Sequence, residues 1–154
     1  MPHRNAAGII VLDPEDRVAL VRHVKPGAYD FWVAPGGGVE DGEDLLDAAR
    51  REALEEAGLA IGEARLVAIE QLYGPKGKTH QVKHWFFARG AAQSLASDAS
   101  SRTIELIVET RWLAREELER KIVFPPFLLD DFWKALAAGF PEIVIMPMRV
   151  MTFE

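Results

Sequence analysis

The chain of 154 residues has the composition of a folded protein with a sizeable core, since 49% of its residues are hydrophobic and 27% are charged. Its formal net charge of −6 argues against a general nucleic-acid-binding surface, so an anionic substrate would need a locally positive site made by basic side chains or a metal ion. The absence of cysteine excludes disulfides, thiolate nucleophiles and thiolate-rich zinc sites.

We expect a cytoplasmic protein with a single domain over residues 1–154. The N-terminal stretch MPHRNAAG lacks the apolar run of a signal peptide, and no segment approaches the roughly eighteen apolar residues of a membrane span. No internal repeat and no linker long enough to divide domains is present. Neither a nucleic acid nor a membrane is therefore an expected partner.

Short apolar runs separated by turn signals predict strands in the first half of the chain. The runs AAGIIVLD (6–13) and RVALVRHV (17–24) flank the turn-forming DPED, which indicates a strand pair. The stretch YDFWVAPGGG (29–38) predicts a short strand that leads into a glycine-rich loop. A helix should follow, capped by Asp41 at its start and ended by Gly58.

The second half of the chain is predicted to contain three further strands, at 64–73, 79–89 and 103–114. The small polar stretch 90–101 indicates a loop, and REELERK (115–121) a short helix. The stretch PPFLLDDFWKALAAG (125–139) has an initial proline, helical spacing and a terminal glycine, which predict the second main helix. The tail 142–154 predicts a last strand, which Pro147 restricts to the edge of the sheet.

Two main helices and about six strands in irregular alternation predict an α/β fold in which helices cover a mixed sheet. The apolar tail allows two interpretations. As an edge strand it is a pairing surface for a homodimer, and it can equally close the sheet of its own chain.

The first helix carries three glutamates where helix electrostatics favours cations. Glu52, Glu55 and Glu56 share an arc of roughly 100° on a helical wheel. The arc borders a stripe of Leu46, Ala49, Ala53 and Ala57 that we expect to be buried. A solvated acidic face paired with Arg50 and Arg51 is the alternative. Because three carboxylates converge after a glycine-rich loop, and clustered oxygen ligands select Mg²⁺ or Mn²⁺, a divalent-cation site is the better interpretation.

The stretch 37–59 resembles the Nudix box, G-x5-E-x7-R-E-U-x-E-E-x-G-U, in which U is a bulky aliphatic residue. The matching positions are Gly37, Glu43, Arg51, Glu52, Glu55, Glu56, Gly58 and Leu59. Ala53 is smaller than the usual aliphatic residue. The sequences FWVAPGGG and ETRWLAREEL are also similar to family surroundings, so the resemblance spans residues 5–137. It implies a Nudix-type α/β/α sandwich around a mixed sheet.

The resemblance also implies a pyrophosphohydrolase that needs Mg²⁺ or Mn²⁺ and cleaves a nucleoside diphosphate linked to another group. Glu52, Glu55 and Glu56 would hold the metal, which would clamp the phosphates and lower the pKa of a bound water. A backbone carbonyl of the glycine loop, that of Gly36, would complete part of the coordination. Structural roles are implied for four other box residues, Gly37, Glu43, Arg51 and Gly58. Of these, Arg51 would orient a box carboxylate and Glu43 would hold the loop to the helix.

The general base is open between the box glutamates and two acidic residues further along the chain, Glu109 and Glu105. These two are four residues apart and share one face of a regular strand. Glu109 stands three residues before Trp112, where similar proteins often carry a fourth acidic ligand. The alternative for each glutamate is a solvated strand residue.

Basic residues that could bind substrate phosphates are Arg22, His23, Lys25, Lys76 and Lys78. For each of them a solvated surface charge is the alternative. Trp32 and Trp85 fit core packing better than stacking on a base. His80 and His84 share a strand face, but no third metal ligand lies nearby in the sequence.

The sequence gives few signals for the substrate. Pro75 lies sixteen residues after Leu59, a spacing typical of ADP-ribose pyrophosphatases, although a turn alone would explain it. ADP-ribose or a nucleotide sugar is the first expectation, followed by a dinucleoside polyphosphate or a damaged nucleoside triphosphate. A non-catalytic Nudix domain that senses nucleotides or binds proteins is the alternative of another class.

Overall fold

The computed structural model describes residues 3–74, 79–90, 93–98, 101–102 and 106–151. Its strands are β1 (His3–Leu12), β2 (Val18–Lys25), β3 (Tyr29–Val33), β4 (Gly36–Gly38), β5 (Arg65–Tyr73), β6 (His80–Arg89), β7 (Ile107–Leu113), β8 (Val123–Phe124), β9 (Val144–Ile145) and β10 (Arg149–Val150). Its helices are α1 (Leu45–Ala57), α3 (Arg115–Leu118), the 3₁₀ helix η2 (Pro126–Leu129) and α4 (Asp131–Ala137).

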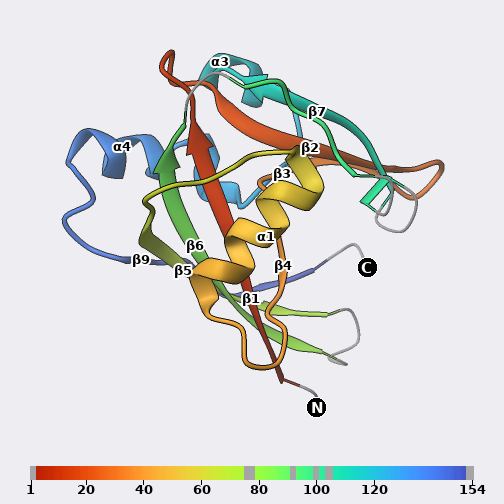
Figure 1. Cartoon of the computed structure of the whole chain (residues 1–154), viewed down its shortest axis with the longest axis horizontal. Coiled ribbons are helices and arrows are strands. Elements are labelled where there is room, and N and C mark those ends of the chain that lie inside the picture. Colours follow the sequence, from red (N-terminus) through yellow and green to blue (C-terminus); the bar gives the residue numbers. More distant parts are fainter. Residues whose placement is uncertain (1–2, 75–78, 91–92, 99–100, 103–105, 152–154) are drawn as a thin grey trace.

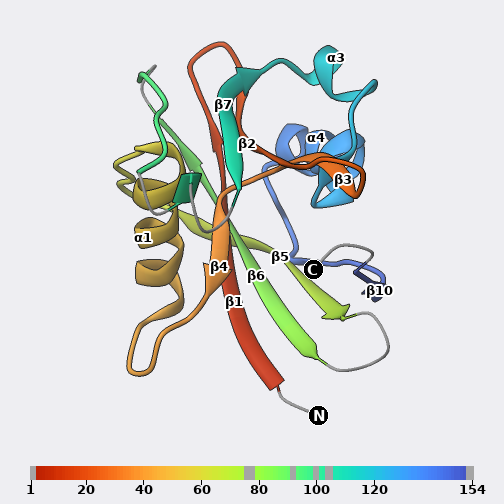
Figure 2. The same ribbon diagram turned by 90° about the vertical axis from the view of Figure 1, so that its right-hand side faces the viewer.

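The described strands form one mixed sheet in the order β10-β5-β6-β1-β2-β3-β8, with β4 paired to β1, β7 to β2 and β9 to β5. The central pair β1–β6 is parallel, with His3 opposite His80 at one end and Leu12 opposite Arg89 at the other. The neighbouring pairs β1–β2 and β5–β6 are antiparallel. Figure 2 shows α1 on one face of this sheet and α4 on the other, which confirms the predicted α/β/α sandwich.

The core is divided between the two faces of the sheet because side chains alternate along β1. Ile9 and Val11 pack on the α1 side, whereas Ile10 and Leu12 pack on the α4 side. All four are fully buried, which explains why this strand is a continuous apolar run. The face of α1 against the sheet consists of small residues, Ala48, Ala49, Ala53 and Ala57, so the helix lies close to the strands (Figure 1).

The first helix begins later than the sequence indicated. Asp44, and not Asp41, is the N-cap, and its carboxylate accepts a hydrogen bond of 2.8 Å from the backbone N–H of Leu46. Gly42 and Glu43 lie in the preceding turn, where Gly42 has a φ of 77°. The turn therefore uses the residues that a cap at Asp41 would have placed in the first helical turn.

The predicted helix over 125–139 is divided into η2 and α4. The break lies at Asp130, whose φ of −149° and ψ of −64° are not helical. Phe127 and Leu128 before the break and Phe132 and Trp133 after it all pack in the same core cluster. A single straight helix is thus replaced by two short ones that both direct aromatic side chains into the core.

The tail adds to the sheet of its own chain. Both β9 and β10 pair in parallel with β5, where Val144 lies opposite Ala68 and Arg149 opposite Leu72. This is one of the two arrangements that the sequence left open, and the homodimer stays a prediction. None of the helices in the described ranges has both the length and the apolar character needed to cross a membrane.

Candidate functional site

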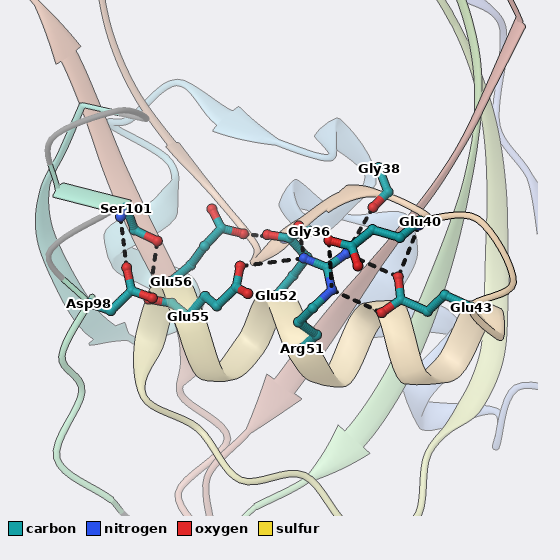
Figure 3. A network of polar contacts seen from close by, with 10 residues as sticks. All are labelled: Gly36, Gly38, Glu40, Glu43, Arg51, Glu52, Glu55, Glu56, Asp98 and Ser101. Atoms are coloured by element: carbon teal, nitrogen blue, oxygen red, sulfur yellow. Dashed lines mark hydrogen bonds and ion pairs between the residues drawn. The ribbon is translucent and has the colours of Figure 1, made fainter.

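The C-terminal end of α1 carries the three box glutamates without a basic residue in its last turn. Gly58 ends the helix with a φ of 69°, as predicted. The backbone carbonyl of Glu55 accepts hydrogen bonds from the backbone N–H of Asp98 at 2.8 Å and the hydroxyl of Ser101 at 3.2 Å (Figure 3). The loop after β6 thus supplies hydrogen-bond donors to the backbone at the end of this helix. The partners of the glutamate side chains lie elsewhere.

Arg51 connects the carboxylates of the box (Figure 3). Its Nε donates to Glu43 Oε2 at 2.9 Å, and its Nη2 donates to the carbonyl of Gly38 at 3.0 Å. Its Nη1 donates to Glu52 Oε1 at 2.9 Å and to Glu55 Oε2 at 3.4 Å. The hydrogen bonds from Arg51 hold the pKa of the Glu43 carboxyl below its ordinary value, and the same pair raises the pKa of Arg51. One guanidinium therefore donates hydrogen bonds to three carboxylates and to the glycine strand.

The other box contacts join α1 directly to β4. Glu56 is 2% exposed, and its Oε1 accepts a hydrogen bond of 2.8 Å from the backbone N–H of Gly36. The Glu52 carboxylate lies against Gly37, where a Cβ would be only 2.5 Å from Glu52 Oε1. A side chain at position 37 would thus displace the carboxylate, which explains why the box has glycine there.

The donor chemistry of this cluster fits a hard divalent cation. Glu52 is 6% exposed, and its Oε2 is buried without a hydrogen-bond partner among the described residues. A buried anionic oxygen without a donor is costly unless a cation compensates it. As the side chains lie, no group of three or more histidine or acidic residues in the described ranges is arranged around a metal-sized centre. Instead, the Nη1 of Arg51 contacts both Glu52 and Glu55.

A pocket of about 250 Å³ lies on β4, lined by all three of its glycines. Its basic side chains are Arg4, Lys83 and Arg149. The sequence analysis missed all three because they lie in separate strands and belong to no motif. The one signal available in the sequence was the alternation of side chains along β6. It places Lys83 on the same face of the sheet as Trp85.

Arg22 and Glu109 meet in a second pocket of about 400 Å³, which also contains Trp32 and none of the box glutamates. Arg22 donates to the two carboxylate oxygens of Asp30 at 2.8 and 2.6 Å and to Glu109 Oε2 at 3.2 Å. The hydrogen bonds to Asp30 and Glu109 raise the pKa of Arg22. Both residues therefore have protein partners away from β4.

Of the remaining predicted ligands, the two that the structure describes, His23 and Lys25, do not line the pocket on β4. His23 stacks on Phe31 with ring centroids 5.2 Å apart, and Lys25 is exposed at the end of β2. Glu105, Lys76 and Lys78 lie outside the described residues. Their roles, like that of Glu109, stay predictions.

The two tryptophans pack in the core, and the two histidines of β6 have separate polar partners. Trp32 and Trp85 are both buried in the core on the α4 side, as predicted. The two histidines of β6 do not share a partner, because His80 contacts His3 at 2.8 Å whereas His84 bonds to a carbonyl of β1 at 3.0 Å.

A family model described as the NUDIX domain matches residues 2–130. The chain is 32% identical over 134 residues to an RNA pyrophosphohydrolase of Pelagibacter ubique, in an alignment that covers 80% of this chain and 84% of the relative. It is 28% identical over 155 residues to an RNA pyrophosphohydrolase of Erythrobacter litoralis, covering 92% and 93% of the two chains.

Solved structures share the fold at lower identity. A MutT NUDIX hydrolase from Burkholderia pseudomallei has a TM-score of 0.69 and 23% identity, covering 84% of this chain and 98% of that chain. The NUDIX domain of Shewanella oneidensis NrtR, complexed with ADP ribose, has a TM-score of 0.72 and 14% identity, covering 88% and 90%. Because the family model matches most of the length of the chain, the chain belongs to the NUDIX domain family and is a Nudix hydrolase.

Proposed function

We propose that this enzyme hydrolyses a pyrophosphate bond of a phosphorylated nucleotide with Mg²⁺ or Mn²⁺ held by Glu52, Glu55 and Glu56. The observation that carries the proposal is the buried Glu52 Oε2, which has no donor among the described residues. It belongs to a cluster in which a single guanidinium serves three carboxylates. When bound, the metal would neutralise phosphate oxygens and lower the pKa of an attacking water.

The protein groups around the ion would have separate roles. Arg51 would fix the carboxylates of Glu52 and Glu55, and the N–H of Gly36 would fix Glu56. The carbonyl of Gly36 remains a proposed metal ligand. We place the general base among the box glutamates, because Glu109 is paired with Arg22 in the second pocket.

RNA is the substrate that we propose first, in place of the expectation that nucleic acid is not a partner. The two relatives described above, whose alignments cover 92% and 80% of this chain, are RNA pyrophosphohydrolases. An unmodified RNA carries phosphate anhydride bonds only at a 5′ end with more than one phosphate. Only this end would need to enter a basic pocket, so the overall charge of −6 is compatible with the proposal. ADP-ribose has weaker support, since a turn alone would explain Pro75 and the ADP-ribose-bound relative is 14% identical.

The test is a hydrolysis assay with a short 5′-triphosphorylated RNA, ADP-ribose, a dinucleoside polyphosphate and an oxidised nucleoside triphosphate, in Mg²⁺, Mn²⁺ or EDTA. We expect metal-dependent cleavage of the RNA and loss of at least about 100-fold in rate for Glu56→Gln, with Glu142→Gln as the exposed control. Equal rates in EDTA, or full activity of Glu56→Gln, would contradict the metal proposal. If the enzyme cleaves ADP-ribose and does not cleave the RNA, ADP-ribose would replace RNA as the proposed substrate.

A further inference from the structure

The three glycines of β4 separate the glutamate cluster from the basic pocket with backbone alone. Gly37 faces Glu52, as described above. Gly36 and Gly38 face the pocket, where added Cβ atoms would lie 3.0 Å from Lys83 Cε and against the guanidinium of Arg4. The basic pocket and the proposed reaction centre thus lie on opposite sides of the same strand, β4.

The ammonium group of Lys83 lies in this pocket and has no hydrogen-bond acceptor among the described residues. Its Nζ lies 4.4 Å from the centroid of the Trp85 ring, and it forms no hydrogen bond or ion pair with the residues that the structure describes. Burial lowers the pKa of this ammonium, while the charges of Glu70, Glu56 and Glu52 oppose the shift. An ammonium has three donors, so Lys83 has its donors available for an anion in the pocket.

Arg149 enters the same pocket from β10. Its guanidinium lies 4.5 Å from the ring of Phe124, and its Nε is 3.5 Å from Glu70 Oε2. That Nε is buried without a hydrogen bond to a described residue. Arg149 lies beyond residues 2–130, the part of the chain that matches the family model.

Glu70 is the countercharge of this group. It is 2% exposed, lies directly opposite Lys83 in the β5–β6 pair, and accepts a hydrogen bond of 3.0 Å from Trp85 Nε1. With Arg4, Lys83 and Arg149 against one carboxylate, the pocket has an excess of two positive charges in a chain whose net charge is −6. That excess matches a phosphate group, which carries up to two negative charges.

We propose that Lys83 and Arg149 bind a phosphate group of the substrate in the pocket on β4. This inference rests on the function proposed above and adds that a residue from the tail, outside the matched family domain, takes part in substrate selection. Because both cations have donors that no described residue satisfies, the phosphate would complete hydrogen bonds that the protein leaves unmade.

The direct test measures binding of inorganic pyrophosphate and of ADP by calorimetry in EDTA, so that neither a metal ion nor hydrolysis contributes. Lys83→Met and Arg149→Met should each weaken binding at least about ten-fold relative to the unchanged protein. Lys134→Met and Arg89→Met are the matched controls, since both side chains are more than half exposed and neither lines the pocket. Binding of the controls should stay within about two-fold of the unchanged protein.

Hydrolysis of the substrate identified above gives the second readout, in which both pocket variants should raise KM at least ten-fold with a smaller change in kcat. Arg149→Lys keeps the positive charge and should therefore bind the probes more tightly than Arg149→Met. If Lys83→Met does not fold, the comparison of these two Arg149 variants tests the inference instead. Binding of both probes within two-fold of the unchanged protein in Lys83→Met and Arg149→Met would overturn this inference, even for an active enzyme. Weakened binding in an enzyme that hydrolyses nothing would instead support the pocket and overturn the proposed function.

Discussion

Replacing Arg51 with methionine tests whether one guanidinium holds the acidic cluster together. Methionine keeps an unbranched apolar stem but removes the donors to Glu43, Glu52, Glu55 and the Gly38 carbonyl. The buried Glu52 carboxylate would then have lost its donor. We therefore expect a large loss of stability in EDTA.

The size of this loss follows from burial. The side chains of Arg51 and Glu52 are 24% and 7% exposed. Removing one partner of a buried ion pair costs about 3–5 kcal/mol, and the partial exposure of Arg51 favours the lower end, about 3 kcal/mol. For a domain of this size, 1 kcal/mol corresponds to about 2–4 °C, so the midpoint of thermal unfolding should fall by about 6–12 °C.

The assay is thermal unfolding followed by circular dichroism, with Arg50→Met as the control on the adjacent residue. Arg50 is 38% exposed, and its ion pair with Asp47 at 3.5 Å is on the surface, so its loss should cost less than about 1 kcal/mol. A fall of less than about 2 °C for Arg51→Met, or equal falls for both variants, would refute the account of the cluster. Added Mg²⁺ should recover part of the loss if an ion replaces the guanidinium as the compensating charge.

The stability of Arg51→Met should also depend on pH differently from that of the unchanged protein. Arg51 lowers the pKa of Glu43 from its ordinary value of 4.5, so the stabilisation from this pair is complete above pH 4.5. It is lost as the pH falls through the lowered pKa of the folded state. The stability difference between the unchanged protein and Arg51→Met should therefore narrow below pH 4.5, and a constant difference down to pH 3 would contradict the reasoning.

Three further predictions concern the glycines and the tail. Gly37→Ala would place a Cβ 2.5 Å from Glu52 Oε1, so we expect it to reduce metal-dependent hydrolysis more than about ten-fold, and unchanged kinetics would contradict the close approach. Gly58→Ala would put a side chain at a φ of 69° and 2.8 Å from the carbonyl oxygen of Ala96, which should cost about 1–2 kcal/mol in urea unfolding; an unchanged midpoint would be the contrary result. The exposed Ile145 and Val150 on β9 and β10 support the predicted homodimer, for which sedimentation velocity should give a dimer and a monomer would count against it.

The helix of the box could be predicted in detail because its signals are local. The spacing of the alanines placed Glu52 and Glu56 beside the buried face, and both are buried. Gly58 ended the helix as its conformational freedom requires. The cap was misassigned because the choice between Asp41 and Asp44 depends on the turn before the helix, which places Glu43 for its contact with Arg51.

The basic pocket could not be predicted because it depends on which strands become neighbours. Lys83 and Glu70 meet through the register of β5 and β6, and Arg149 joins them only because β10 pairs with β5. The surroundings of Arg22, whose role as a phosphate ligand stays a prediction, depend on strand pairing in the same way. Its position on the way to the glycine loop indicated a phosphate ligand, but the pairing of β2 with β3 and β7 brings it to Asp30 and Glu109.

Calorimetric titration of Mn²⁺ into the enzyme is the most direct test of the proposal that the box carboxylates bind a divalent ion. We expect saturable binding to the unchanged protein, at least about ten-fold weaker binding to Glu52→Gln, and unchanged binding to Glu142→Gln. Absence of Mn²⁺ uptake, or equal affinity in Glu52→Gln, would contradict the metal site on which the proposed hydrolysis depends.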